Sequence, residues 1–161
     1  MKVIDMHCDT IMVLMNGKDE LRKSNNMIDL EKMQKGNYLL QCFAMFVPYV
    51  SKNKEEKYSP FEYCNKMIDK YYSELENNKE YILPAYTFHD IENNMKRGKI
   101  SAVLTVEEGA VCEGDLDKLR ALYDRGVRMM TFTWNYTNCL GSPNSLEDEK
   151  AIINTEFGLT E

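Results

Sequence analysis

Hydrophobic residues along this chain gather in two long, nearly continuous runs, with helix-like repeats between them. The runs cover residues 38–47 (YLLQCFAMFV) and residues 100–106 (ISAVLTV). Continuous apolar runs of this length are typical of strands that are buried on both faces of a parallel sheet. Shorter apolar stretches at residues 3–4 and 127–133 (VRMMTFT) predict one strand each. The pattern therefore predicts four strands.

The segments between the runs carry helix start and stop signals. Ser59 precedes Pro60 and Glu62, a combination that predicts a capped helix start. Three further helices are predicted by an N-cap residue and a terminal glycine, namely Asp29 with Gly36, Thr87 with Gly98, and Asp115 with Gly126. The last helix is amphipathic, with an apolar face formed by Leu116, Leu119, Leu122 and Tyr123. Strands that alternate with helices imply parallel βα units, in a small doubly wound sheet or in half of a (β/α)8 barrel.

Length and composition restrict the class of protein. The chain has 161 residues, which suits a single domain over residues 1–161 and is too short for a complete (β/α)8 barrel of roughly 250 residues. A net charge of −6 argues against nucleic-acid or anionic-membrane partners. The five cysteines include no CxxC pair, and the first residues lack the pattern of a signal peptide. These features predict a cytoplasmic protein without a disulfide framework.

Candidate chemistry lies at the predicted strand ends. His7 and Asp9 follow the first strand, and Glu107 follows the strand at residues 100–106. Function in α/β proteins gathers beyond the carboxyl ends of the strands. On an extended backbone, residues two apart project to the same side, so an imidazole nitrogen and a carboxylate oxygen can bind one divalent cation. A carboxylate at the position of Glu107 can bridge two such ions.

Each of these residues also has a purely structural interpretation. For His7 and Asp9, the alternative is a loop that has an aspartate cap and a solvated histidine, although their position directly after a buried strand favours metal binding. Glu107 and Glu108 can also belong to the start of the next helix, where acidic residues are favourable. This alternative suits Glu108 better, because Glu107 directly adjoins the strand. His89 lies in the first turn of a predicted helix and is expected to be a surface residue.

Several short segments together form a specific set of motifs. Residues 5–10 read DMHCDT, residues 106–109 read VEEG, residues 119–128 read LRALYDRGVR, and residues 157–161 read FGLTE. In this order they resemble the D-G-H-x-D-L/T opening, the V-E-G-G … L-R-A-L-Y-x-x-G-x-R stretch and the start of the G-L-T/S-x-F-G element of the membrane (renal) dipeptidases and their bacterial relatives. The resemblance covers essentially the whole chain.

The resemblance implies a (β/α)8 barrel that holds two zinc ions and hydrolyses dipeptides, often with a D-residue at the C-terminal position. By position, His7 and Asp9 would bind one zinc ion and Glu107 would bridge both. Glu107 and Asp9 are then the catalytic residues, since a bridging water would attack the scissile carbonyl and Asp9 would help to move the proton.

Trp134 stands where animal members of the family have a substrate-binding histidine, and Asn135 follows it. The indole N–H of Trp134 or the amide of Asn135 would then donate a hydrogen bond to the substrate. The alternative for Trp134 is aromatic packing at the mouth of the barrel.

We therefore predict an α/β fold that forms the N-terminal half of a metal-dependent-hydrolase-type (β/α)8 TIM barrel, with about four βα units. The family's second zinc is held by histidines on later strands, so the chain is expected to be an incomplete and inactive part of a zinc dipeptidase. Two alternatives stay open. One is a non-catalytic half-barrel module that forms a homo-oligomer or docks a partner, and the other is the same fold acting on an N-acyl amino acid or a lactam.

Overall fold

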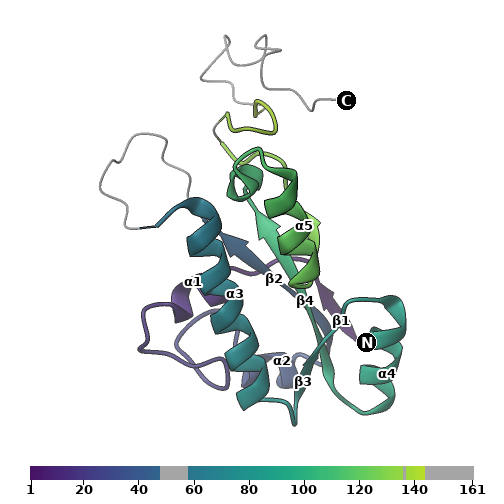
Figure 1. Ribbon diagram of the computed structural model, residues 1–161. Coiled ribbons are helices and arrows are strands. Elements are labelled where there is room, and N and C mark those ends of the chain that lie inside the picture. Colours follow the sequence, from purple (N-terminus) through teal and green to yellow (C-terminus); the bar gives the residue numbers. More distant parts are fainter. Residues whose placement is uncertain (48–57, 136, 144–161) are drawn as a thin grey trace.

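The computed structural model describes residues 1–47, 58–135 and 137–143, in which parallel strands alternate with helices (Figure 1). In chain order the elements are β1 (Val3–Asp5), α1 (Thr10–Leu14), α2 (Leu30–Lys35), β2 (Tyr38–Phe46), α3 (Pro60–Asn77), β3 (Ile82–Pro84), α4 (Phe88–Lys96), β4 (Ile100–Glu107), the 3₁₀ helix η1 (Gly109–Cys112), α5 (Leu116–Asp124) and β5 (Val127–Met130). The motif at residues 157–161 lies outside the described residues.

The strands form one parallel sheet in which β2 lies between β1 and β4. Two strands share the other edge of β4, because β3 pairs with residues 100–102 and β5 pairs with residues 104–106. The predicted parallel α/β fold is confirmed. The prediction of four strands is wrong, since the described residues contain five. The additional strand, β3, has three residues and lies in the short apolar stretch of residues 81–86 (YILPAY), where Pro84 argues against a strand in the sequence. The last strand is also shorter than predicted and ends at Met130.

Helices α1 and α3 lie against one face of the sheet, and the core lies between them and β2 and β4 (Figure 1). Phe43 and Met45 of β2 and Leu104 of β4 are buried in this layer. Tyr71 of α3 packs edge-on against Phe43, with ring centroids 5.7 Å apart. Its hydroxyl donates a hydrogen bond of 3.1 Å to the carbonyl oxygen of Ala102. Burial of each large apolar side chain stabilises the fold by roughly 1.5–3 kcal/mol.

Helix α3 begins where the sequence predicts. The Ser59 hydroxyl accepts a hydrogen bond of 3.3 Å from the Glu62 N–H, and the Glu62 carboxylate accepts one of 2.9 Å from the Ser59 N–H. This reciprocal pair satisfies two N–H groups that a helix start leaves without intrahelical partners. The apolar stripe follows in phase, since Cys64, Ile68 and Leu75 are all buried.

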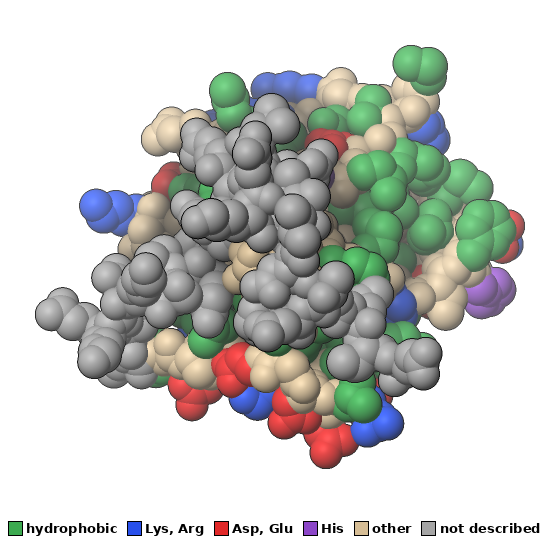
Figure 2. All heavy atoms as spheres, turned by 90° about the horizontal axis from the view of Figure 1, so that it is seen from above, with side chains coloured by type: hydrophobic (Ala, Val, Ile, Leu, Met, Phe, Trp, Pro, Cys, Tyr) green, Lys and Arg blue, Asp and Glu red, His purple; other side chains and the backbone are tan. Residues whose placement is uncertain are grey.

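The apolar face of α5 is buried at one residue and exposed at the others. Leu122 is fully buried in the core, whereas Leu116 is 66% exposed and Tyr123 is 59% exposed. The helix therefore has the predicted amphipathic pattern, but most of its apolar face is open to solvent in this chain. Hydrophobic side chains are also visible at one side of the molecule seen from above (Figure 2).

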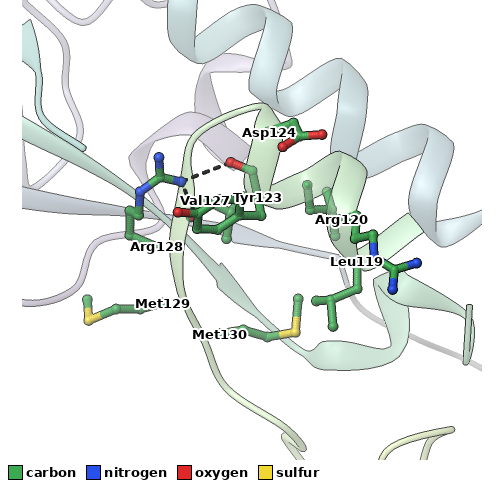
Figure 3. A pocket seen from close by; sticks show the side chains of 9 residues that line it. Leu119, Arg120, Tyr123, Asp124, Val127, Arg128, Met129 and Met130 are labelled. Atoms are coloured by element: carbon green, nitrogen blue, oxygen red, sulfur yellow. Dashed lines mark hydrogen bonds between the residues drawn. The ribbon is translucent and has the colours of Figure 1, made fainter. Parts of the chain in front are cut away.

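A groove separates this face of α5 from β5 (Figure 3). Leu119 of α5 and Met130 of β5 both line it. Arg128 closes one end, because its guanidinium lies 4.3 Å from the centre of the Tyr123 ring and donates a hydrogen bond of 2.9 Å to the Tyr123 carbonyl oxygen. The groove is therefore largely apolar, with a cation held at its edge by main-chain oxygens and an aromatic ring.

Asp29, the N-cap of α2, is expected to make stability depend on pH. Burial alone would raise the pKa of its carboxyl group, but hydrogen bonds from Lys32 and the Ser24 N–H, with the Lys32 charge 2.8 Å away, hold the pKa below its ordinary value. A lowered pKa stabilises the fold above the ordinary value of 3.8, and this stabilisation is lost as the pH falls through the folded-state value.

Replacing Asp29 with asparagine keeps an N-cap acceptor and removes the charge. The free energy of unfolding, measured by urea denaturation, should fall by about 1–2 kcal/mol at pH 7, and the difference should close as the pH falls through the lowered folded-state pKa. Asp115→Asn, at the exposed N-cap of α5, is the control and should change stability by less than about 0.5 kcal/mol. A pH-independent loss in Asp29→Asn would contradict the electrostatic explanation.

Gly126 connects α5 to β5 with a φ of +102°, which favours glycine. A Cβ atom there would collide with the Tyr72 hydroxyl and lie 2.7 Å from Cε1 of Tyr86. Gly98 has a φ of +67° but nothing within 4 Å of the same position. Urea denaturation should show that Gly126→Ala lowers the free energy of unfolding by about 2–3 kcal/mol. Gly98→Ala, which adds only backbone strain, should cost about 1 kcal/mol, and equal losses would contradict the steric argument.

Among the described residues, no helix combines the length and the hydropathy needed to cross a membrane.

Candidate metal centre

The three predicted ligand residues lie at the carboxyl ends of β1 and β4, on either side of β2. Backbone pairing continues past the end of β1, since the Cys8 N–H donates to the Cys42 carbonyl oxygen at 3.1 Å and the Ala44 N–H donates to the Cys8 carbonyl oxygen at 2.9 Å. On this extended segment Cys8 points into the core and is 8% exposed, while the side chains of His7 and Asp9 are about half exposed. The alternation predicted for residues 7–9 is therefore present.

The side chains of His7, Asp9 and Glu107 converge on one point. His7 Nε2 lies 2.9 Å from a carboxylate oxygen of Glu107 and 3.4 Å from Oδ1 of Asp9. One ligand atom from each of the three residues lies within 4.8 Å of the other two. Among the described residues, these three side chains form the group of histidine, cysteine, aspartate or glutamate residues that is close enough together to share a metal ion. Imidazole nitrogen and carboxylate oxygen are both donor types that bind zinc.

The environment of Asp9 fits a cation better than a helix cap. Asp9 occupies the N-cap position of α1, yet its side chain makes no capping hydrogen bond. Its Oδ1 atom is buried and accepts no hydrogen bond, although His7 Nε2 is nearby. A buried carboxylate oxygen without a donor is costly, and a metal ion would satisfy it. The capping interpretation of Asp9 is therefore wrong.

Glu107 is the most enclosed of the three ligand residues, with 19% of its side chain exposed. Burial raises the pKa of its carboxyl group above the ordinary value, and the charges of Asp9 and Glu108 add to this effect, while His7 opposes it. A divalent cation would reverse the balance, because it stabilises every carboxylate around it. The residues present therefore fit a bound zinc ion in both donor type and charge.

Trp134 and Asn135 follow β5, and Trp134 reaches the strand pair in which Glu107 lies. The Trp134 ring packs edge-on against Phe46, with centroids 5.1 Å apart, and Phe46 is paired with Glu107 across β2 and β4. The aromatic packing proposed for Trp134 is thus present, and with 40% of the residue exposed a face remains open to solvent. Asn135 is exposed. His89 is on the surface, as predicted, with its side chain 76% exposed beside Glu92.

Two residues near the cluster do not stand out in the sequence. Glu108 is 1% exposed and its carboxylate accepts hydrogen bonds from Ala110, Trp134 and Asn138. Asn138 is itself buried and reaches Glu108 from the loop after β5. A loop asparagine and a glutamate beside another glutamate carry no signal of this contact in the sequence.

Strand-end ligands on a parallel sheet define an α/β protein with a candidate metal centre, and the sequence identifies its family. The sequence profile of the membrane dipeptidases (peptidase family M19) matches residues 1–161. The chain therefore belongs to this family of metallopeptidases. No curated protein matches the sequence.

Several solved structures are similar to the chain. One is a metallopeptidase described as dipeptidase AC, with a TM-score of 0.75 and 19% identity, over 88% of this chain and 45% of that one. Another is a metallopeptidase from Rhodobacter sphaeroides bound to a phosphinate mimic of the dipeptide L-Ala-D-Ala, with a TM-score of 0.75 and 17% identity, over 88% of this chain and 48% of that one. A third is an amidohydrolase from Pseudomonas aeruginosa, with a TM-score of 0.60 and 17% identity, over 70% of this chain and 31% of that one.

These likenesses concern the fold. The chain spans less than half the length of each of the three structures. The α/β fold with a parallel sheet is thus that of part of a dipeptidase of this family.

Proposed function

We propose that this chain contributes to a zinc-dependent dipeptidase site in which His7 and Asp9 bind one zinc ion and Glu107 bridges that ion to a second. The observation that carries the proposal is the convergence of the three side chains, with ligand atoms within 4.8 Å of one another. Membership of the dipeptidase family supports the reaction class. The Oδ1 atom of Asp9, which is buried and accepts no hydrogen bond, supports the presence of a cation.

Each residue has a role that follows from its surroundings. When bound, zinc supplies a water of lowered pKa and Lewis-acid polarisation of a substrate carbonyl. Glu107 places a carboxylate oxygen 2.9 Å from His7 Nε2, where it would serve as a zinc ligand. Asp9 holds a second carboxylate oxygen at the same point and helps to move the proton. Trp134 and Asn135 would form a wall of the site, and the indole N–H of Trp134 or the amide of Asn135 would donate a hydrogen bond to the substrate.

We propose a dipeptide as the substrate, including dipeptides with a D-residue at the C-terminal position. The related structure from Rhodobacter sphaeroides, which holds a mimic of L-Ala-D-Ala, supports this choice. Among the described residues, three side chains would hold one ion, and no other group of such side chains lies close enough together to hold a second. We therefore infer that the 161-residue chain binds zinc weakly and that turnover needs further ligands.

A binding experiment tests the proposal without requiring turnover. Calorimetry of the 161-residue chain with the phosphinate mimic of L-Ala-D-Ala should show binding only when Zn²⁺ is present. Glu107→Gln removes the charge of one ligand residue at nearly unchanged size and should abolish the Zn²⁺-dependent binding of the mimic. Binding that is independent of zinc, or no binding with zinc bound, would contradict the proposal.

The same titration separates the alternative substrate class. Competition by a dipeptide, but not by an N-acyl amino acid or a lactam, is the expected result. Stronger competition by either of the other two amides would favour a different hydrolase on the same fold.

A second candidate function is a non-catalytic half-barrel module that self-associates, and the open groove between α5 and β5 favours it. Light scattering gives the mass of the chain directly. A homo-oligomer that binds no zinc would support this candidate over the dipeptidase site.

A further inference from the structure

Glu108 has an unusual environment for an acidic residue. It directly follows Glu107 and is 1% exposed. Among the described residues its carboxylate makes no ion pair within 4 Å with a lysine, arginine or histidine, so N–H donors alone satisfy it. Burying a carboxylate is costly unless its oxygens are hydrogen-bonded. The residue is thus kept at this place by the groups that it binds.

The backbone of Glu108 is strained, so some contact must hold the residue in this conformation. Its φ is +83° and its ψ is +95°, a conformation that glycine adopts easily and glutamate does not. Strained residues persist where the surrounding structure holds them and are concentrated at functional sites. At Glu108 the hydrogen bonds of the side chain supply that restraint.

The donors that reach Glu108 come from two parts of the chain. The Ala110 N–H donates to Oε1 at 3.1 Å from within η1. The side-chain amide of Asn138 also donates to Oε1, and the backbone N–H of Trp134 donates to Oε2 at 3.3 Å. Both donors follow β5 in the chain. The Asn138 amide also donates to the Phe132 carbonyl oxygen at 2.7 Å. Glu108 therefore joins the end of β4 to the loop that carries Trp134.

The hydrogen bonds of Glu108 help to fix the position of the Trp134 side chain. Its ring lies on Phe46, and Phe46 pairs with Glu107, so the indole stands beside the candidate metal centre. We infer that Glu108 is a positioning residue, which holds Trp134 and Asn138 in place after β5 so that Trp134 forms a fixed wall of the ligand site. The position of Trp134 follows from the contacts described above, whereas the effect of Trp134 on ligand binding rests on the proposed function.

The chain contains one tryptophan, so its fluorescence reports this loop directly. Glu108→Gly removes all three acceptor contacts and also relieves the backbone strain. Its emission should shift to longer wavelength, and quenching by acrylamide should increase, because the indole leaves Phe46. Glu113→Gly is the matched control. Glu113 is another glutamate with positive φ, and its carboxylate binds Phe61 and Lys118 instead.

A second variant changes the donor of the hydrogen bond between Asn138 and Glu108 instead of its acceptor. Asn138→Asp replaces the amide donor by a carboxylate at nearly unchanged size, so it repels Glu108. It should release Trp134 as Glu108→Gly does, whereas Glu113→Gly should keep the wild-type emission and quenching. Wild-type fluorescence in both Glu108→Gly and Asn138→Asp would overturn the clamp, whatever the protein binds. A change of fluorescence in Glu113→Gly as large as that in Glu108→Gly and Asn138→Asp would also overturn the clamp.

Ligand titrations test the consequence for the site. In Glu108→Gly, Zn²⁺ affinity should stay within about threefold of the wild type, while affinity for the phosphinate mimic of L-Ala-D-Ala falls about tenfold or more. Equal loss of both affinities, or unchanged affinity for the mimic with Trp134 released, would overturn the positioning role. If the wild-type chain bound no mimic, the proposed function would fail, and the fluorescence would still decide the clamp.

Discussion

Replacing His7 with alanine should lower the Zn²⁺ affinity of the chain by about 100-fold or more. His7 supplies the nitrogen ligand of the cluster, and without it two carboxylates remain, a set that suits magnesium or calcium better than zinc. Loss of a residue that only orients a ligand already costs about 10–100-fold, so loss of the ligand itself should cost at least the upper end of that range. Competition with a chromophoric chelator at pH 7 measures the change.

The chain contains two histidines, and the second one is a matched control. His89 is on the surface of α4 with 76% of its side chain exposed, so His89→Ala should leave Zn²⁺ affinity unchanged. Thermal unfolding of the two metal-free variants should agree with the wild type within a few degrees, since both histidine side chains are at least half exposed. Zinc affinity that survives His7→Ala, or that falls equally in His89→Ala, would show that the metal binds elsewhere.

Replacing Leu122 with alanine should lower the free energy of unfolding by about 2–5 kcal/mol. Leu122 is fully buried in the core, so its truncation loses burial and leaves a cavity. Leu116 lies on the same helix and is 66% exposed, so Leu116→Ala should cost less than about 0.5 kcal/mol. Both variants make the same chemical change in α5, and urea denaturation compares them directly.

The comparison also tests whether the apolar face of α5 is open in solution. Equal costs for the two substitutions would mean that Leu116 is covered by another molecule. A cost of Leu116→Ala that grows with protein concentration would identify that molecule as a second copy of the chain. A small and concentration-independent cost would show that the face is open, as the structure describes it.

Much of the fold was predictable because its signals are local. The caps at Ser59 and Thr87 are formed by residues three positions apart, and both helices start as predicted. The buried strands β2 and β4 are long enough for an apolar run to reveal them. β3 is too short for such a signal, and the exposure of Leu116 depends on what packs over α5, which no local pattern contains.

The same distinction applies to the candidate site. The convergence of His7 and Glu107 follows from a general rule, because parallel strands place their carboxyl ends at one edge of the sheet. The contact of Glu108 with Asn138 joins residues 30 positions apart and depends on a positive φ that a glutamate does not predict. Sequence reasoning therefore predicts which residues converge at the candidate site, while the contacts that support them depend on tertiary structure.

The central position of β4 has a consequence for the order in which the chain can assemble. β4 is the common hydrogen-bonding partner of β2, β3 and β5. As the chain leaves the ribosome, β1 and β2 can pair early, but β3 has no strand to join until residues 100–102 have been made. Glu107 is the last residue of that strand. The same stretch of nascent chain therefore joins β2 to β3 and brings Glu107 to His7 and Asp9, so neither this part of the sheet nor the candidate metal centre should form in a peptide that stops before β4.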